Sequence, residues 1–141
     1  MDIPEQNVVR SVKRLYLLMN RHIDDVLKHY GLARSQFQVL YFTNKAQSLT
    51  QKELLEVMQI EPATLTVIID GLVKKGLLER TENIKDKRSK LLRLTQQGEQ
   101  LRKRIPSLHE IIERRMFQSI SENEKKQAIK LINQIIHNLE Q

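Results

Sequence analysis

The fold of this chain is decided by three consecutive segments: residues 49–60 (LTQKELLEVMQI), 61–76 (EPATLTVIIDGLVKKG) and 77–95 (LLERTENIKDKRSKLLRLT). The first two segments predict two short helices joined by a tight turn, and the third predicts a basic β-hairpin. Thr50 and Glu53 form a capping-box pattern that starts the first helix. Pro62 suits the first turn of the second helix, where its missing N–H is not needed, and Gly76 is placed to end that helix.

The hairpin leads into a further helix. Its strands are predicted over Leu77–Glu82 and Lys90–Thr95, and the intervening loop is too long for a two-residue turn. Thr95 is predicted to cap the helix that follows. Pro106 should kink or split that helix near residues 102–105, because proline removes a backbone donor and clashes with the preceding turn.

Long amphipathic helices are predicted on both sides of this stretch. Residues 6–29 keep a helical apolar pattern for more than six turns, and residues 36–43 indicate a short buried helix. Ser121 and Glu124 form a second capping box, which opens a final helix that is apolar over more than one stripe. A terminal helix of a monomer would not need so many Ile and Leu residues, so a partner chain is the simplest explanation.

Composition narrows the class of protein. The chain has 141 residues, of which 40% are hydrophobic and 29% charged, and it contains no Cys. These values predict a single folded domain without disulfides or thiolate metal sites, and no apolar run is long enough to span a bilayer. Residues 1–20 show no signal-peptide pattern, so a cytoplasmic protein without membrane association is expected.

The positive charge is concentrated in one region. Residues 80–104 hold nine Lys/Arg and three Asp/Glu, which gives +6 of the total net charge of +7. A localised basic patch favours a polyanionic partner, although a solvated surface loop would explain the same charges. The four histidines contain no His-x-x-x-His pair, so surface or interface roles are expected and no metal site is predicted. No nucleophile–base set and no Gly-rich phosphate loop is present, so neither catalysis nor a cofactor is expected.

Three motifs, in order, resemble the MarR family of winged helix-turn-helix transcriptional regulators. They are Leu49-Thr50-Gln51-Lys52-Glu53-Leu54, the run from Thr64-Leu65-Thr66 to Leu78-Glu79-Arg80, and Asp86-Lys87-Arg88 followed by Leu94-Thr95-Gln96-Gln97-Gly98. The resemblance implies a mainly α fold with a small β-hairpin wing and a homodimer of single-domain chains. It places the DNA-binding head in residues 34–100 and the dimerisation helices in residues 1–30 and 105–141.

The resemblance also implies a function, which is sequence-specific repression at a near-palindromic operator in double-stranded DNA. The recognition helix would enter the major groove, and the wing would reach the minor groove. The expected DNA-binding residues are Thr50, Gln51, Pro62, Ala63, Thr64, Thr66, Val67, Lys74, Lys85, Lys87, Arg88 and Lys90. Asp86 would repel DNA if it were unpaired, so an ion pair with Arg80 or Arg88 is expected to orient the wing.

Many members of the family are released from DNA by a small aromatic or phenolic ligand. The corresponding pocket would be lined by Tyr16, Met19, His22, Phe37 and Tyr41, with Arg102 or Arg104 near a ligand carboxylate; plain core or dimer contacts would also explain these residues. This chain departs from the family pattern at Val67, where many members carry a basic residue. Gly71, inside the same helix, would permit a close helix contact.

Other functional classes remain open from the sequence. The weakly basic recognition face would also fit a protein-interaction module without base readout. A sequence-tolerant DNA binder would show a steep salt dependence with little sequence preference. An enzyme is a more distant alternative.

Overall fold

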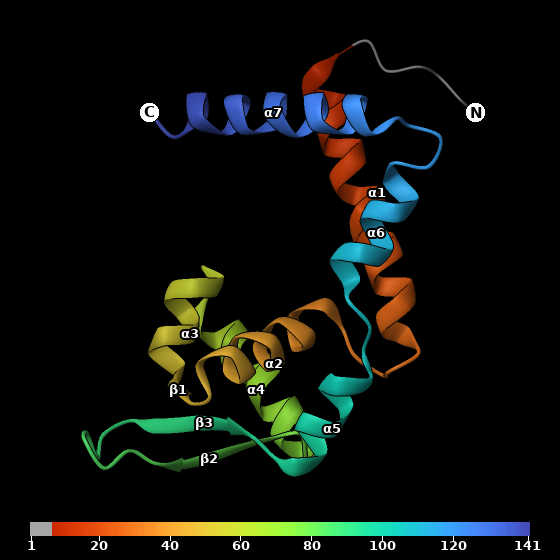
Figure 1. Ribbon diagram of the computed structural model, residues 1–141. Coiled ribbons are helices and arrows are strands. Elements are labelled where there is room, and N and C mark those ends of the chain that lie inside the picture. The colour runs from red at the N-terminus through yellow and green to blue at the C-terminus, as the bar shows by residue number, and fades with distance from the viewer. Residues whose placement is uncertain (1–6) are drawn as a thin grey trace. The chain divides into compact units, whose positions relative to one another are not determined.

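The computed structural model describes residues 7–141 (Figure 1). The chain divides into two compact units, and the boundary between them lies between Pro106 and Ser107. The predicted helix start at residue 6 and the beginning of the predicted 1–30 dimerisation segment lie outside the described residues. No helix among residues 7–141 is both long enough and apolar enough to cross a membrane.

The first unit holds five helices and three short strands in its described part. In chain order these are α1 (Val8–Lys28), α2 (Arg34–Ala46), β1 (Leu49–Thr50), α3 (Gln51–Met58), α4 (Pro62–Lys74), β2 (Leu78–Glu82), β3 (Lys90–Leu94) and α5 (Gln96–Arg104). The sheet is antiparallel with the order β1-β3-β2, and the β2–β3 hairpin forms the wing (Figure 1). The predicted mainly helical fold with a small hairpin is confirmed.

Strand β1 is an element that the sequence pattern did not predict. Its two residues pair with β3, Leu49 opposite Leu92 and Thr50 opposite Leu91. Two residues are too few to show a strand period, and their extended geometry depends on pairing with a strand more than forty positions away. The sheet consequently has three strands instead of the predicted two.

Local capping fixes where the helices of the head begin. The Thr50 hydroxyl accepts from the Glu53 amide at 3.2 Å, and the Glu53 carboxylate accepts from the Thr50 amide at 3.0 Å. Pro62 lies in the first turn of α4. The Thr95 hydroxyl accepts from the Gly98 amide at 3.0 Å and so starts α5. The capping box, the proline start and the Thr95 cap are confirmed.

The core of the first unit orients α4. The fully buried residues come from several helices and both long strands: Leu27, Val39, Leu40, Thr43, Leu54, Leu65, Ile69, Leu72, Leu78 and Leu92. Three of them, Leu65, Ile69 and Leu72, form one stripe of α4. Each such burial contributes about 1.5–3 kcal/mol. This stripe fixes the rotation of α4, so its opposite face is exposed.

A close backbone contact sets the base of the wing. The Thr95 hydroxyl donates to the carbonyl oxygen of Gly76 at 2.6 Å, and the Thr95 amide donates to that of Leu77 at 3.1 Å. At Gly98 an added Cβ would stand only 2.1 Å from the Leu77 oxygen. Only glycine allows the start of α5 to approach the entrance to β2 this closely.

The second unit contains α6 (Leu108–Met116) and α7 (Glu122–Leu139). The predicted interruption around Pro106 is confirmed, because α5 ends at Arg104 and α6 begins at Leu108. The predicted capping box of α7 is also present, since the Glu124 amide donates to the Ser121 hydroxyl at 3.1 Å and the Ser121 amide donates to the Glu124 carboxylate at 3.2 Å. Lys125 joins α7 to α6 through Glu113, at 3.5 Å.

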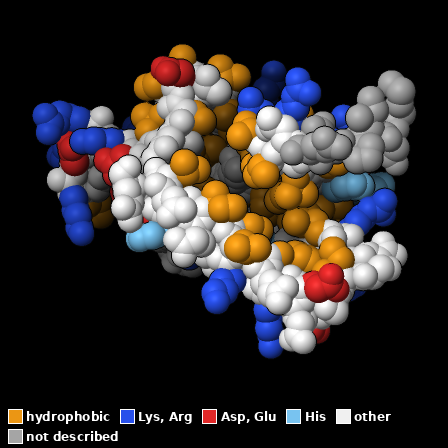
Figure 2. Space-filling view, turned by 90° about the horizontal axis from the view of Figure 1, so that it is seen from above, with side chains coloured by type: hydrophobic (Ala, Val, Ile, Leu, Met, Phe, Trp, Pro, Cys, Tyr) orange, Lys and Arg blue, Asp and Glu red, His pale blue; other side chains and the backbone are white. Residues whose placement is uncertain are grey.

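Large apolar side chains remain uncovered on α1 and on α7. Helix α7 has no buried residue. Its exposed apolar side chains are Ile129, Leu131, Ile132, Ile135, Ile136 and Leu139, and those of α1 are Val8, Val9, Val12, Leu15, Tyr16, Leu17 and Leu18. Hydrophobic side chains are visible at the surface in Figure 2. Monomeric proteins rarely expose so many large apolar side chains along one helix.

Candidate nucleic-acid interface

Helix α4 presents an exposed face made of small and apolar side chains. Pro62, Ala63, Thr64, Thr66, Val67, Asp70 and Lys74 are exposed, and the fraction exposed for Val67 is 72%. Ala63, Thr66, Val67 and Asp70 follow the i, i+3, i+4, i+7 spacing and therefore share one stripe. This stripe lies opposite the buried one, so a partner surface can reach it without rearrangement of the core.

Two of the predicted DNA-binding residues hydrogen-bond to each other. The Gln51 side-chain amide donates to the Thr66 hydroxyl at 2.8 Å, and that hydroxyl donates to the backbone carbonyl of Pro62 at 3.1 Å. The first bond ties the start of α3 to α4. Thr50 is similarly occupied, because its hydroxyl donates to the Glu53 carboxylate at 3.0 Å. The head therefore uses these polar groups to fix its own geometry.

The acidic residue on the α4 stripe is paired. The Asp70 carboxylate accepts a hydrogen bond from the guanidinium of Arg80 on β2. The pair links the recognition helix directly to the wing. It was not predicted from the sequence, because Asp70 and Arg80 lie in different elements and only the tertiary arrangement brings them together.

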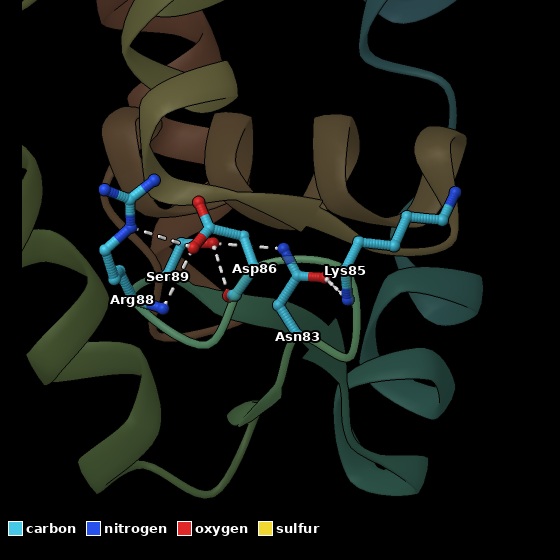
Figure 3. Close-up of polar contacts among 5 residues, drawn as sticks. All are labelled: Asn83, Lys85, Asp86, Arg88 and Ser89. Atoms are coloured by element: carbon cyan, nitrogen blue, oxygen red, sulfur yellow. Dashed lines mark hydrogen bonds and ion pairs between the residues drawn. The ribbon is translucent and has the colours of Figure 1, made fainter.

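The wing loop, residues 83–89, is held by polar side chains that bond to one another (Figure 3). The Asn83 side chain accepts from the Lys85 amide at 3.1 Å and donates to the Ser89 hydroxyl at 3.0 Å. The Ser89 hydroxyl donates to the carbonyl oxygen of Asp86 at 3.3 Å, and the Ser89 amide donates to the same oxygen at 3.1 Å. These bonds give the loop a defined turn.

The turn presents Arg88 to solvent. Its backbone amide and its Nε both donate to Asp86 Oδ1, at 3.1 and 3.2 Å, while 93% of the side chain is exposed. The ion pair uses Nε and leaves the Nη groups pointing away from the loop (Figure 3). Of the two expected partners of Asp86, the structure therefore shows Arg88. The predicted pairing with Arg80 is wrong, because Arg80 lies on β2 and is held by Asp70 instead.

The lysines predicted to contact phosphates surround this turn. Lys85, Lys87 and Lys90 are all exposed. In Figure 3 the Lys85 side chain extends to the side of the loop opposite to Arg88. Cations on both sides of one hydrogen-bonded loop suit a partner that carries negative charge along two walls, as a DNA groove does.

Comparison with known proteins agrees with this geometry. The sequence profile described as "MarR family" matches residues 30–89. The multiple antibiotic resistance protein MarR of Escherichia coli is 30% identical over 121 residues, which cover 83% of this chain and 82% of that protein. The chain belongs to the MarR family. The transcriptional repressor MdtR of Bacillus subtilis is 29% identical over 118 residues, covering 84% of this chain and 76% of that protein.

One solved MarR structure contains DNA. The crystal structure of a mutant E. coli MarR complexed with operator DNA has a TM-score of 0.73 and 26% identity, and the match covers 94% of this chain and 99% of that one. The similarity in fold therefore extends over almost the whole of both MarR-family chains.

Lys75, which sequence reasoning did not single out, fixes the MarR-family head to the end of α1. Its ammonium group donates to the carbonyl oxygen of Gly31 at 2.7 Å and to the Gln36 side chain at 3.2 Å. The Gln36 oxygen also accepts from the Ala33 amide at 3.0 Å. Lysine near a helix C-terminus is a capping signal, but Gly31 lies 44 positions earlier in the chain, so no local pattern identifies this bond.

The predicted effector residues of this MarR-family chain lie on α1 and α2. Phe37 and Tyr41 are one helical turn apart, with ring centroids separated by 6.2 Å, whereas 62% of Tyr16 is exposed. Met19 and His22 are half-buried on α1. The predicted cation Arg102 also has a protein partner, because the Asn44 side-chain oxygen, in its hydrogen-bonded orientation, accepts from Arg102 Nε at 2.9 Å.

Proposed function

We propose that this chain is a sequence-specific DNA-binding transcriptional repressor. The observation that carries this function is the combination of an exposed α4 face with a hydrogen-bonded wing turn that presents Arg88. Two similar proteins support this function: MdtR, which is described as a transcriptional repressor, and MarR, which has been crystallised with operator DNA. The related MarR and MdtR proteins come from bacteria, whose DNA lies in the cytoplasm. A regulator of the same family would therefore act in the cytoplasm.

The two parts of the head have different proposed roles. The α4 face enters the major groove, where base edges carry sequence information. Arg88 enters the minor groove, whose negative potential favours an inserted guanidinium. Phosphate contacts from the remaining polar and basic residues position the head: Thr50, Gln51, Lys74, Lys85, Lys87 and Lys90.

The proposed repressor is a homodimer. On each of the two helices α1 and α7, the uncovered apolar side chains supply a surface that a second copy would bury. Two heads would then read half-sites about 34 Å apart, one helical turn of DNA. This arrangement explains why a near-palindromic operator is expected.

The proposed release mechanism is binding of a small aromatic or phenolic ligand near Phe37 and Tyr41, whose rings lie close together on α2. Such a ligand lowers DNA affinity only by the difference between its affinities for the DNA-binding state and the released state. A screen of phenols and aromatic carboxylates against the protein–DNA complex tests this part. The proposal predicts dissociation by at least one compound and a weaker response in Phe37→Leu; DNA affinity unchanged by every compound would contradict it.

The DNA-binding function is tested by titrating the purified protein with DNA from upstream of its own gene and with scrambled DNA of equal length. We expect the upstream DNA to bind at least about a thousandfold more tightly. Thr64→Ala should reduce that ratio. Arg88→Ala should weaken binding, whereas Arg114→Ala, which removes an exposed arginine of α6 outside the head, should not.

The same titration separates the alternatives. Equal affinity for both DNAs with a steep salt dependence would identify a sequence-tolerant binder. Absence of binding to either DNA would remove the regulator function and leave a protein-interaction module.

A further inference from the structure

In the first two turns of α4, the side chains of the exposed stripe present methyl groups at their outer ends. Ala63, Thr66 and Val67 each carry at least one methyl, and Val67 is 72% exposed although its neighbours Leu65 and Ile69 are fully buried. All three share the stripe that faces away from the core. A partner that approaches this stripe therefore meets a small apolar cluster, here called the methyl cluster.

The polar part of Thr66 is turned away from such a partner. The single hydrogen of its hydroxyl is donated to the Pro62 carbonyl at 3.1 Å, and its oxygen accepts from Gln51 at 2.8 Å. A side chain held by these two bonds keeps one rotamer, since χ1 is restricted in a β-branched residue. A partner on this stripe therefore finds no free donor hydrogen on Thr66 and meets its methyl group.

Groups for bidentate base recognition are missing from α4 before its last residue, Lys74. Guanine is usually read by Arg or Lys and adenine by Asn or Gln. From Pro62 to Val73, α4 carries none of these four residue types. Asp70, which would accept a bond from cytosine, already accepts one from Arg80. Among the bases, thymine is the one that offers an apolar group in the major groove, its C5 methyl.

We infer that the methyl cluster of Ala63, Thr66 and Val67 selects operator sites by packing against thymine C5 methyl groups in the major groove. The inference rests on the proposed DNA-binding function and states which base the head selects. Thymine is required at one or two positions in each half-site. These positions are read by burial of apolar surface instead of by hydrogen bonds.

The test replaces each thymine of the bound DNA, one at a time, by uracil. Uracil lacks only the C5 methyl and pairs with adenine unchanged, so backbone contacts and base pairing are preserved. We expect affinity to fall about fourfold for each contacted methyl that is removed. The fold-change should persist at high salt, because no phosphate contact is lost. Uracil at uncontacted positions of the same DNA serves as the internal control.

Variants of the protein assign the effect to the methyl cluster. Val67→Ala and Thr66→Ser remove methyls and should reduce the loss caused by uracil at the contacted positions. Thr66→Val keeps the methyl, deletes the hydroxyl and should retain that loss. Val57→Ala, at a valine of α3 that is 51% exposed, is the matched control and should also retain it. These substitutions lie at exposed positions, and circular dichroism verifies folding.

Each outcome decides one claim. Uracil-sensitive positions that lose their sensitivity in Val67→Ala or Thr66→Ser support the inference. Specific binding that no uracil substitution weakens would overturn it while leaving the proposed repressor intact. Uracil sensitivity that is unchanged in both variants would also overturn it, since other groups would then read the methyls. Failure to bind any DNA specifically would instead remove the proposed function on which the inference rests.

Discussion

Gly98 controls how closely α5 approaches the start of β2. An added Cβ would lie 2.1 Å from the Leu77 carbonyl oxygen, and a backbone atom cannot rotate away as a flexible side chain can. We therefore expect Gly98→Ala to lower the free energy of unfolding by roughly 1–3 kcal/mol, the usual cost of overpacking. Urea denaturation of the variant beside the wild type measures this. Unchanged stability would mean that the wing base can shift freely.

Thr43 is a buried residue whose hydroxyl finds no hydrogen-bond partner among the described residues. A buried polar group without a partner costs about 1–3 kcal/mol. Thr43→Val keeps the branched shape and removes this group, so the variant should be more stable by about 1 kcal/mol in the same urea experiment. Thr43→Ser, which keeps the hydroxyl and loses a methyl, should be less stable. If Thr43→Val were less stable than the wild type, the Thr43 hydroxyl would have a hydrogen-bond partner after all.

At the scale of elements, α4 contains a glycine that its surroundings do not require. The sequence suggested that Gly71 allows a close helix contact, but the atom nearest to an added Cβ is the Gln36 side-chain nitrogen at 3.6 Å, an ordinary contact distance. Gly71→Ala should therefore raise the free energy of unfolding by about 1 kcal/mol through helix propensity alone. Thermal and urea unfolding check this prediction, and a loss of stability would contradict it. Gly98→Ala is expected to lower the free energy of unfolding and Gly71→Ala to raise it, so each variant serves as a control for the other.

Helix α7 begins with a capping box whose state depends on pH. Hydrogen bonds with the Ser121 side chain, and then with its backbone amide, lower the pKa of the Glu124 carboxyl below its ordinary value. Because the folded-state pKa is the lower one, the cap stabilises the helix above the ordinary carboxyl pKa and is lost as pH falls through the lowered value. Ser121→Ala should return the Glu124 pKa toward its ordinary value, as followed by NMR titration of its side chain. No movement would show that Ser121 is not the cause.

For the whole molecule, the uncovered side chains of α7 lead to a prediction about assembly. Ile132 and Ile136 lie one turn apart, and each is 47% exposed in the single chain. Placing glutamate at both positions should prevent a second copy from covering them, because burial of two unpaired carboxylates is strongly unfavourable. Light scattering should then give the 16.7 kDa of one chain instead of about twice that mass. Persistence of the dimer would place its interface elsewhere.

The sequence predicted those features that depend on neighbouring residues. The capping boxes at Thr50 and Ser121 and the break at Pro106 are local, and the structure contains each of them. Contacts between distant elements were not predictable in the same way. Arg80 was one of the two arginines expected to pair with Asp86, but the fold places it beside a different carboxylate, Asp70. Similarly, the sequence predicted Thr66 as a DNA-binding residue, but nothing near it along the chain indicates that Gln51 bonds to its hydroxyl.

The bond between Gln51 and Thr66 has a consequence for how such a protein diverges after gene duplication. A substitution at Gln51 would leave the Thr66 hydroxyl bonded only to the Pro62 carbonyl. Its oxygen would then be available to accept a hydrogen bond from a base, without any change in the sequence of the recognition helix. Operator preference would then change through a mutation in a neighbouring helix. Paralogues with identical recognition helices need not, for this reason, share the same target genes.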